Sequence, residues 1–333
     1  MHSSGRGAAA SLRQAWRTML ELPFFTSTEA YVATLGNREF WRPYVAPVLA
    51  RHGLEAAGEP LHAGRGSTFP TFICGEAVVK LFGHLPFWKS AYGAELAAFR
   101  CLAGDDAVLA PRLLAQGRLC DTPAAPWTYL ITSRMAGTQW DQAALSDAGR
   151  SRIAADLGEQ VRRLQALQPT SGIPTPEAWS APGPAEAAAQ TALPQHLIAE
   201  VEQYVASRDL SGNLDPVVVH GDLMDRHVFV SGERLAGTID WGDALATDPH
   251  YELAQLQLNL FEGNKDLLRT FLHHSDWPVG RSFARQALGQ AFHRQAVGLA
   301  QHRTMDVFHK LPALLPLEDI RTLDELADAV FGL

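Results

Sequence analysis

The segment His220-Gly221-Asp222-Leu223, together with His227 and the later Ile239-Asp240-Trp241, decides the fold. It places a His-Asp pair on a loop, a second polar residue five positions after the Asp, and a third carboxylate beyond a predicted hairpin. Magnesium in phosphate-binding sites uses one or two carboxylates together with phosphate oxygens. The layout is therefore typical of a site that holds a metal-bound phosphate beside a base.

A hairpin is predicted between the two ends of this pattern. The β-prone runs 228–230 and 235–239 flank Ser231-Gly232-Glu233-Arg234, which has turn residues where a turn is needed. Because the hairpin folds the chain back, we expect Asp240 to return beside His227.

Asp222 follows the short apolar run 216–220, which predicts a strand, so its carboxylate would lie on a loop. A carboxylate there could take a hydroxyl proton as a general base, although an isolated Gly-Asp pair more often only caps its own turn. The context favours the catalytic role. His220 can hydrogen-bond loop carbonyls and fix the turn, and Gly221 permits a backbone geometry that other residues resist.

Asp240 and His227 are candidate metal ligands of unequal strength. A carboxylate suits Mg²⁺, whereas an imidazole is more typical of transition metals. The alternative interpretation of His227 is a core histidine held by hydrogen bonds.

Lys80 lies within the apolar run Val78–Phe82. A lysine inside an apolar strand needs a partner or a phosphate. Glu95, on a helix predicted over 87–102, could be that partner. The alternative is a strand lysine that points to solvent.

Upstream, Gly64-Arg65-Gly66-Ser67-Thr68 could approach a phosphate through its backbone amides. A simple turn is the alternative. The segment lacks the G-x-x-x-x-G-K-[ST] pattern, which excludes a Walker-type loop.

Composition narrows the classes of partner. The 333-residue chain is 47% hydrophobic and 19% charged, and its net charge of -8 gives no basic excess for nucleic acid. No apolar run reaches the ~18 residues of a membrane span. Three widely spaced cysteines without a C-x-x-C pair fit a reducing compartment. We therefore expect a cytoplasmic protein with a small-molecule partner, as a monomer or a dimer.

Strand patterns dominate the front of the chain and helical patterns the back, which predicts an α+β protein of two lobes. We expect a flexible leader over 1–25, a β-rich N-terminal lobe with a hinge over 26–135, and a mainly helical C-terminal lobe over 136–333. The Pro-, Ala- and Gly-rich segment 168–194 is interpreted as a long surface excursion with one short helix.

The chain resembles the aminoglycoside phosphotransferase branch of the protein-kinase-like superfamily in the order and spacing of four features: Lys80, Glu95, His220-Gly221-Asp222 and Ile239-Asp240-Trp241. The resemblance runs from about residue 40 to the C-terminus. The chain is most similar to the hygromycin B 7''-O-phosphotransferases, in four segments: Asn37–Trp41, Val79–Gly83, Thr132–Thr138 and Leu256–Asn259.

One departure concerns the metal position. The family usually has Asn where this chain has His227. The preceding loop also reads Met224-Asp225-Arg226 where a more common version has His-Pro-Gly. Asp225 is either an added charge near the metal or a solvated loop residue.

The resemblance implies a bilobal protein-kinase-like fold and a role for each matching position. Asp222 would be the catalytic base, Asp240 the principal Mg²⁺ ligand with His227 at the second metal position, and Asp248 an acid that braces the catalytic loop. ATP, or GTP as an alternative, would be bound by these residues: Lys80 paired with Glu95, the covering loop Gly64 to Thr68, and a hinge over 129–135 that includes Ser133 and Met135.

The leading hypothesis is transfer of the γ-phosphoryl group of ATP to a hydroxyl of an aminoglycoside or aminocyclitol such as hygromycin B. Nearby acids would bind its amines: Asp243, Glu252 and Glu262. An exposed helix face explains Glu252 and Glu262 equally well. Two alternatives stay open, a kinase of another hydroxylated metabolite such as choline or homoserine, and a nucleotide-binding protein without phosphoryl transfer, which His227 motivates.

Overall fold

The computed structural model describes residues 22–54, 59–66, 68–120, 127–207, 215–301 and 305–333. Within them the chain forms two compact units. The first comprises the described residues up to Pro86 together with Ala115–Ile131, and the second comprises Phe87–Leu114 and Thr132–Leu333. Most of the expected leader, 1–25, lies outside the described residues, and the lobe boundaries stay a prediction.

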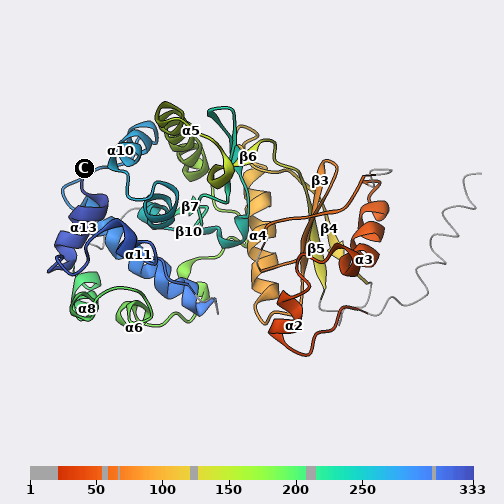
Figure 1. Ribbon diagram of the computed structural model, residues 1–333, viewed down its shortest axis with the longest axis horizontal. Coiled ribbons are helices and arrows are strands. Elements are labelled where there is room, and N and C mark those ends of the chain that lie inside the picture. Colours follow the sequence, from red (N-terminus) through yellow and green to blue (C-terminus); the bar gives the residue numbers. More distant parts are fainter. Residues whose placement is uncertain (1–21, 55–58, 67, 121–126, 208–214, 302–304) are drawn as a thin grey trace, which may run out of the picture. The chain divides into compact units, whose positions relative to one another are not determined.

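The first unit contains most of a five-stranded sheet with the order β1-β2-β3-β5-β4 (Figure 1). β2 and β3 form a hairpin, because they pair antiparallel with Thr71 opposite Lys80. Its elements are α2 (Thr28–Val32), α3 (Arg38–Arg51), β1 (His62–Ala63), β2 (Thr71–Cys74), β3 (Ala77–Phe82), β4 (Leu113–Arg118) and β5 (Thr128–Ser133).

Aromatic side chains form the core between α3 and this sheet. The indole rings of Trp41 and Trp127 are buried, with centroids 5.3 Å apart. The indole N–H of Trp127 donates to the backbone oxygen of Pro23 at 3.0 Å, which satisfies its polar atom. Gly83, after β3, lies directly against the Trp127 ring.

The second unit is mainly helical, so the predicted α+β architecture is confirmed. Its longer helices are α4 (Trp88–Leu102), α5 (Asp147–Ala166), α10 (Lys265–His274), α11 (Phe283–Ala300) and α13 (Leu323–Phe331). Ser146 caps α5 by accepting from the Gly149 amide at 3.0 Å. Ile153, Leu157, Val161 and Leu164 form a buried apolar stripe on α5, and α5 packs beside α10 (Figure 1).

The segment 168–194 lies mostly at the surface, as its composition suggested, and contains one short α-helix, Pro184–Ala188. A few of its residues anchor it: Ala188 and Leu193 belong to the main core of this unit, and Ala187 is also buried. The backbone oxygen of Pro174 also accepts from the Ala246 amide at 2.8 Å. The small side chains of Ala187 and Ala188 allow close packing at this anchor.

Two small sheets position the loops of the second unit. One pairs β7 (Val217–Val219) with β10 (Leu245–Thr247), and the other has the order β6-β8-β9, with β6 (Thr138–Gln139), β8 (Val228–Ser231) and β9 (Arg234–Thr238). The antiparallel β8–β9 pair confirms the predicted second hairpin.

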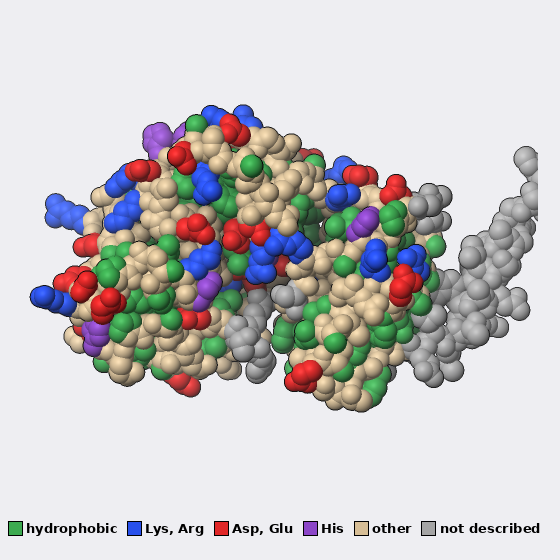
Figure 2. All heavy atoms as spheres, viewed as in Figure 1, with side chains coloured by type: hydrophobic (Ala, Val, Ile, Leu, Met, Phe, Trp, Pro, Cys, Tyr) green, Lys and Arg blue, Asp and Glu red, His purple; other side chains and the backbone are tan. Residues whose placement is uncertain are grey.

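Short helices complete the second unit. They are α6 (Pro184–Ala188), α7 (Gln195–Ile198), α8 (Val201–Val205), α9 (Leu253–Gln255), α12 (Leu311–Leu314), the 3-10 turns η1 (Trp140–Gln142), η2 (Pro176–Ala178), η4 (Trp241–Asp243) and η5 (Pro249–Glu252), and the π-helical turn η6 (Leu256–Leu260). Acidic and basic side chains are interspersed on the face of this unit seen in Figure 2. No helix in the described ranges has the length and apolarity to cross a membrane.

The contact between Gly83 and Trp127 predicts a stability effect. A Cβ at position 83 would collide with the buried indole, so Gly83→Ala should lower the free energy of unfolding by about 1–3 kcal/mol. The matched control is Gly93, in α4, where an added Cβ meets nothing within 4 Å. Gly93→Ala should raise the free energy of unfolding by up to ~1 kcal/mol. Urea unfolding measures both, and equal stability of the two variants would contradict the packing.

Candidate active site

The loop after β7 carries His220, Gly221 and Asp222. Gly221 has a φ of 78°, and an added Cβ would lie 2.5 Å from the backbone oxygen of Asp243. Both the left-handed backbone and the close approach require glycine. The loop is thereby able to pass directly against the 241–243 turn.

His220 fixes the turn, as its place in the sequence suggested. Its side chain is fully buried, its Nε2 lies 2.9 Å from the backbone oxygen of Ile239, and its Nδ1 accepts from the Asp222 amide at 3.2 Å. These partners require a neutral ring protonated at Nε2. Burial and the nearby His227 lower the pKa of His220 to about 4, which agrees with that state.

Glu252, and not Asp248, braces the loop after β7. The Glu252 carboxylate accepts from the backbone amides of His220 at 2.6 Å and Gly221 at 3.2 Å. Asp248 instead accepts from the His250 amide at 2.8 Å at the start of η5. The brace expected at Asp248 is therefore corrected to Glu252. The suggested role of Glu252 in binding substrate amines is also wrong, because its side chain is 1% exposed and already satisfied.

Asp222, His227 and Asp240 meet within the second unit. His227 Nδ1 lies 2.8 Å from the backbone oxygen of Asp222 and 3.3 Å from Asp222 Oδ2. His227 Nε2 lies 3.5 Å from Asp240 Oδ2. The hairpin thus brings Asp240 back beside His227, as we expected. Asp240 has a φ of 64°, and such strain in a non-glycine residue is concentrated at functional sites.

The residues around Asp240 fit a cation shared with a phosphate. The Asp240 side chain is 41% exposed, so a carboxylate oxygen is accessible. With Nδ1 hydrogen-bonded to a backbone oxygen, His227 has the arrangement usual for a metal-binding imidazole. In the part of the chain that the structure describes, no three His, Cys, Asp or Glu side chains surround a metal position. A magnesium ion that takes most of its ligands from phosphates and water does not need three.

The carboxylates on either side of His227 affect the pKa of its ring. Burial opposes the charge, but the carboxylates of Asp222 and Asp240 outweigh it and raise the pKa of His227. A positive charge at this place therefore stabilises the two carboxylates.

Glu95 belongs to the same neighbourhood. It is 5% exposed on α4, and a Cβ added at Gly242 would lie 3.5 Å from Glu95 Oε2 and 3.8 Å from Asp240 Oδ1. Lys80, on β3 of the first unit, is half-buried, with its Nζ 5.5 Å from the ring centroid of Phe82. The pairing of Lys80 with Glu95 stays a prediction.

Close packing explains the two glycines of the expected phosphate-covering loop, whether or not the loop contacts a phosphate. A Cβ at Gly64 would lie 3.1 Å from Thr71, and one at Gly66 would lie 3.3 Å from the backbone oxygen of Phe69. The backbone oxygen of Thr68 accepts from the Tyr31 hydroxyl at 2.8 Å. Ser67 lies outside the described residues. Contact of this loop with a phosphate stays a prediction.

The hinge expected over 129–135 stays a prediction. The Ser133 amide donates to the backbone oxygen of Arg112 at 2.8 Å, and the Ser133 hydroxyl accepts from the Arg112 amide at 2.9 Å. The backbone N–H of Ser133 is therefore already used, and its backbone could offer its carbonyl oxygen to adenine. The Met135 side chain lies against Gly237, where a Cβ would be 2.7 Å from its terminal carbon.

Two residues that contact Asp222 were not predicted from the sequence. Gln255 Nε2 donates to Asp222 Oδ1 at 2.7 Å, and Arg294 Nη2 lies 3.4 Å from the same oxygen. Arg294 is 1% exposed on α11. A signal was present, because both are polar residues on otherwise apolar helix faces, where a buried polar group must have a partner.

The remaining acids proposed for substrate amines are paired with cations of the chain. Asp243 Oδ2 lies 3.8 Å from Arg294 Nη2. Lys310 Nζ lies 3.3 Å from Glu262 Oε1 and 3.6 Å from Asp225 Oδ2. Asp225 is therefore an ion-paired loop residue.

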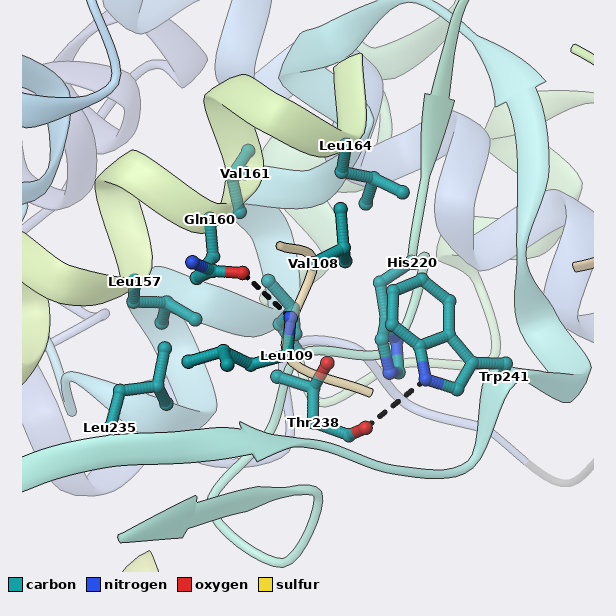
Figure 3. A pocket seen from close by; sticks show the side chains of 11 residues that line it. Val108, Leu109, Leu157, Gln160, Val161, Leu164, His220, Leu235, Thr238 and Trp241 are labelled. Carbon is teal, nitrogen blue, oxygen red and sulfur yellow. Dashed lines mark hydrogen bonds between the residues drawn. The ribbon is translucent and has the colours of Figure 1, made fainter. Parts of the chain in front are cut away.

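A narrow apolar pocket lies behind the catalytic loop (Figure 3). His220 and Trp241 form one side, and Leu157, Val161 and Leu164 of α5 lie on another. The Trp241 indole N–H donates to the backbone oxygen of Thr238 at 3.1 Å. Most of the lining consists of buried core side chains, with the exposed Leu109 and the half-buried Gln160 at its edge, so the pocket belongs to the packing that supports the loop.

Comparison with known proteins gives a family match over most of this region. Residues 63–283 match the model of the phosphotransferase enzyme family, known as APH. The matched range contains Lys80, Glu95 and the whole Asp222–Asp240 neighbourhood.

Solved structures share the fold. The GDP complex of wild-type aminoglycoside 2'-phosphotransferase-IIIa is 17% identical with a TM-score of 0.63, covering 88% of this chain and 96% of that one. Macrolide 2'-phosphotransferase MphH from Brachybacterium faecium is 20% identical with a TM-score of 0.57, covering 81% and 96%. Aminoglycoside phosphotransferase APH(3'')-Id from Streptomyces rimosus is 19% identical with a TM-score of 0.53, covering 77% and 98%. At these identities the likeness shows the fold alone.

The brace predicts a pH-dependent stability. Burial raises the pKa of Glu252 from 4.5 to about 7, although the two amide hydrogen bonds lower it. The stability from this carboxyl group is then fully present below pH 4.5 and is lost as the pH rises through about 7. When the pH is raised from 5 to 8.5, the native chain should therefore lose roughly 2–3 kcal/mol of unfolding free energy that Glu252→Gln does not lose.

Urea unfolding at both pH values measures this difference. Glu262→Gln, at an exposed position, is the matched control and should follow the native chain. If Glu252→Gln also follows the native chain at every pH, the buried carboxyl is not the source of the pH dependence.

Proposed function

Because the chain belongs to the phosphotransferase enzyme family, we propose that it moves the γ-phosphoryl group of ATP to a hydroxyl of an aminoglycoside or aminocyclitol. Hygromycin B is the first acceptor to test. We further propose Mg²⁺ as the metal, GTP as an alternative donor, and the cytoplasm as the location.

The contact between Asp222, His227 and Asp240 carries this proposal. Asp240 supplies an accessible carboxylate for a cation bound to phosphate. Asp222 supplies a second carboxylate on the other side of the His227 ring. Phosphoryl transfer needs these two functions side by side, because its catalysis consists mainly of positioning and charge stabilisation.

In the proposed reaction, Asp222 accepts the proton of the acceptor hydroxyl while the hydroxyl oxygen bonds to the γ-phosphorus. The bond from that phosphorus to its bridging oxygen breaks, and ADP leaves. Asp240 and His227 would hold the cation. Magnesium, when bound, supplies positive charge between the phosphate oxygens.

The residues proposed to bind the nucleotide are those that the family resemblance assigns. Lys80 would contact its phosphates with Glu95 as partner, and Gly64 to Thr68 would cover them. The backbone at Ser133 and Met135 would contact adenine, with Ser133 offering its carbonyl oxygen. Structural neighbours support the proposal that the chain binds a nucleotide, because they are described in complex with GDP, with ADP, and with ATP and streptomycin.

A second candidate acceptor has fewer amines. It is favoured by the pairing of Asp243 with Arg294, and of Asp225 and Glu262 with Lys310. Acids that are neutralised internally attract a polycation less. Choline- or homoserine-like alcohols fit this description, as do macrolides, which are the substrate class named for one structural neighbour.

Transfer of labelled γ-phosphate from ATP to an acceptor panel tests the proposal. The panel contains hygromycin B, kanamycin, a macrolide, choline and homoserine, with Mg²⁺ and with a chelator. We expect Mg²⁺-dependent transfer to an aminoglycoside. Transfer only to choline, homoserine or the macrolide would replace the first candidate by the second. A chain that binds ATP but phosphorylates nothing would return it to the nucleotide-binding alternative.

The base assignment predicts the effect of Asp222→Asn. The amide cannot take the hydroxyl proton, so kcat should fall by about 10²–10⁴-fold with ATP affinity unchanged. Asp225→Asn is the matched control in the same loop, because Asp225 pairs with Lys310, and its kcat should stay near the native value. Steady-state kinetics and calorimetric ATP binding provide the measurements. A native kcat for Asp222→Asn would refute the assignment.

A further inference from the structure

We propose that Gln255 and Arg294 are positioning residues that hold Oδ1 of Asp222, so that Oδ2 is the oxygen presented to the acceptor hydroxyl. The inference rests on the proposed role of Asp222 as the base. It concerns two side chains from α9 and α11 that lie far from Asp222 in the sequence.

The two carboxylate oxygens of Asp222 have unequal surroundings. Oδ1 accepts from Gln255 Nε2 at 2.7 Å and lies 3.4 Å from Arg294 Nη2. Oδ2 lies 3.3 Å from His227 Nδ1, but that nitrogen makes its shorter contact, 2.8 Å, with the backbone oxygen of Asp222. Oδ1 is thus held by two donors, while Oδ2 keeps acceptor capacity for a hydroxyl.

A relay fixes which end of the Gln255 amide faces Asp222. The Asn259 side-chain amide donates to Gln255 Oε1 from four residues further along. Because an ionised carboxylate only accepts, Nε2 is the end of the Gln255 amide that donates to Asp222, and Oε1 is left to accept from Asn259. Asn259 lies in the π-helical turn η6, and such turns are frequent at functional sites.

Arg294 adds a buried positive charge behind the carboxylate. Its guanidinium lies 5.6 Å from the ring centroid of Tyr251 and 3.8 Å from Asp243 Oδ2. Burial opposes the charge, but Tyr251, Asp243 and Asp222 together raise the pKa of Arg294 above its usual value. Arg294 thus remains charged and attracts Oδ1, which favours one rotamer of Asp222.

Displacing the base from its productive geometry is costly. A misplacement of about 1 Å can lower a catalytic rate by about 10²-fold, even when the substituted residue does not touch the substrate. A positioning role therefore predicts a lower kcat with an unchanged KM for ATP.

The decisive variant is Gln255→Glu, which keeps the size of the side chain and replaces the donor beside Oδ1 by a repelling carboxylate. We expect kcat to fall by about 10²-fold with the KM for ATP unchanged. Arg294→Lys keeps the charge but loses the planar fork, and it should retain more activity than Arg294→Met. If Gln255→Glu fails to fold, Gln255→Met removes the donor without adding a charge.

Gln257 provides the matched control. It is fully buried in the adjoining η6 turn, and its Nε2 donates to the backbone oxygen of Val330 at 3.0 Å, away from Asp222. Gln257→Glu should lower stability but leave the kcat of the folded protein unchanged. Equal losses of kcat in Gln255→Glu and Gln257→Glu would overturn the inference.

Crystal structures of the native chain and Gln255→Glu supply a readout that does not need turnover. We expect the Asp222 side chain to rotate in the variant, and an unmoved Asp222 would also overturn the inference. If the native chain transfers no phosphate to any acceptor, the proposed function fails by itself. The rotation of Asp222 still decides whether Gln255 positions it.

Discussion

Two buried backbone amides, those of His220 and Gly221, depend on one buried carboxylate, that of Glu252. Backbone donors removed from water must have partners, and a loop at the end of a strand has few of its own. Glu252 satisfies both, which allows the loop to turn inward without a regular ladder. The neutral ring of His220 then ties the loop to Ile239. The place of Asp222 follows from these contacts and not from its own side chain.

Local features of the site were predictable because they depend on local chemistry. The β8–β9 hairpin follows from apolar runs around turn residues, and the glycine at 221 from a backbone that other residues resist. Long-range partners were not predictable in this way. Asp248 and Glu252 are four residues apart in the sequence, and only the three-dimensional path of the chain determines which carboxylate reaches the loop amides.

The same limit explains Arg294 and the substrate acids. Arg294 is far from Asp222 in the sequence, and nothing local to α11 shows that two carboxylates surround it. Acids were expected to serve a cationic substrate because they lie near the motif. In the structure, cations of the chain itself neutralise Asp243 and Glu262. Proximity in sequence identifies an acid, but its counter-charge decides whether it is available.

The β8–β9 hairpin contains one residue more on its second strand than on its first. Phe229 faces Gly237 while Val230 faces Leu235, which leaves Ala236 as a bulge. Since side chains alternate along a strand, one extra residue exchanges the two faces for everything that follows. The bulge at Ala236 therefore determines on which face the side chains of the following residues, up to Asp240, lie. In a relative that has the same sequence motif but lacks the bulge, the carboxylate that corresponds to Asp240 would point in a different direction. The length of the hairpin is therefore as informative for this fold as the motif itself.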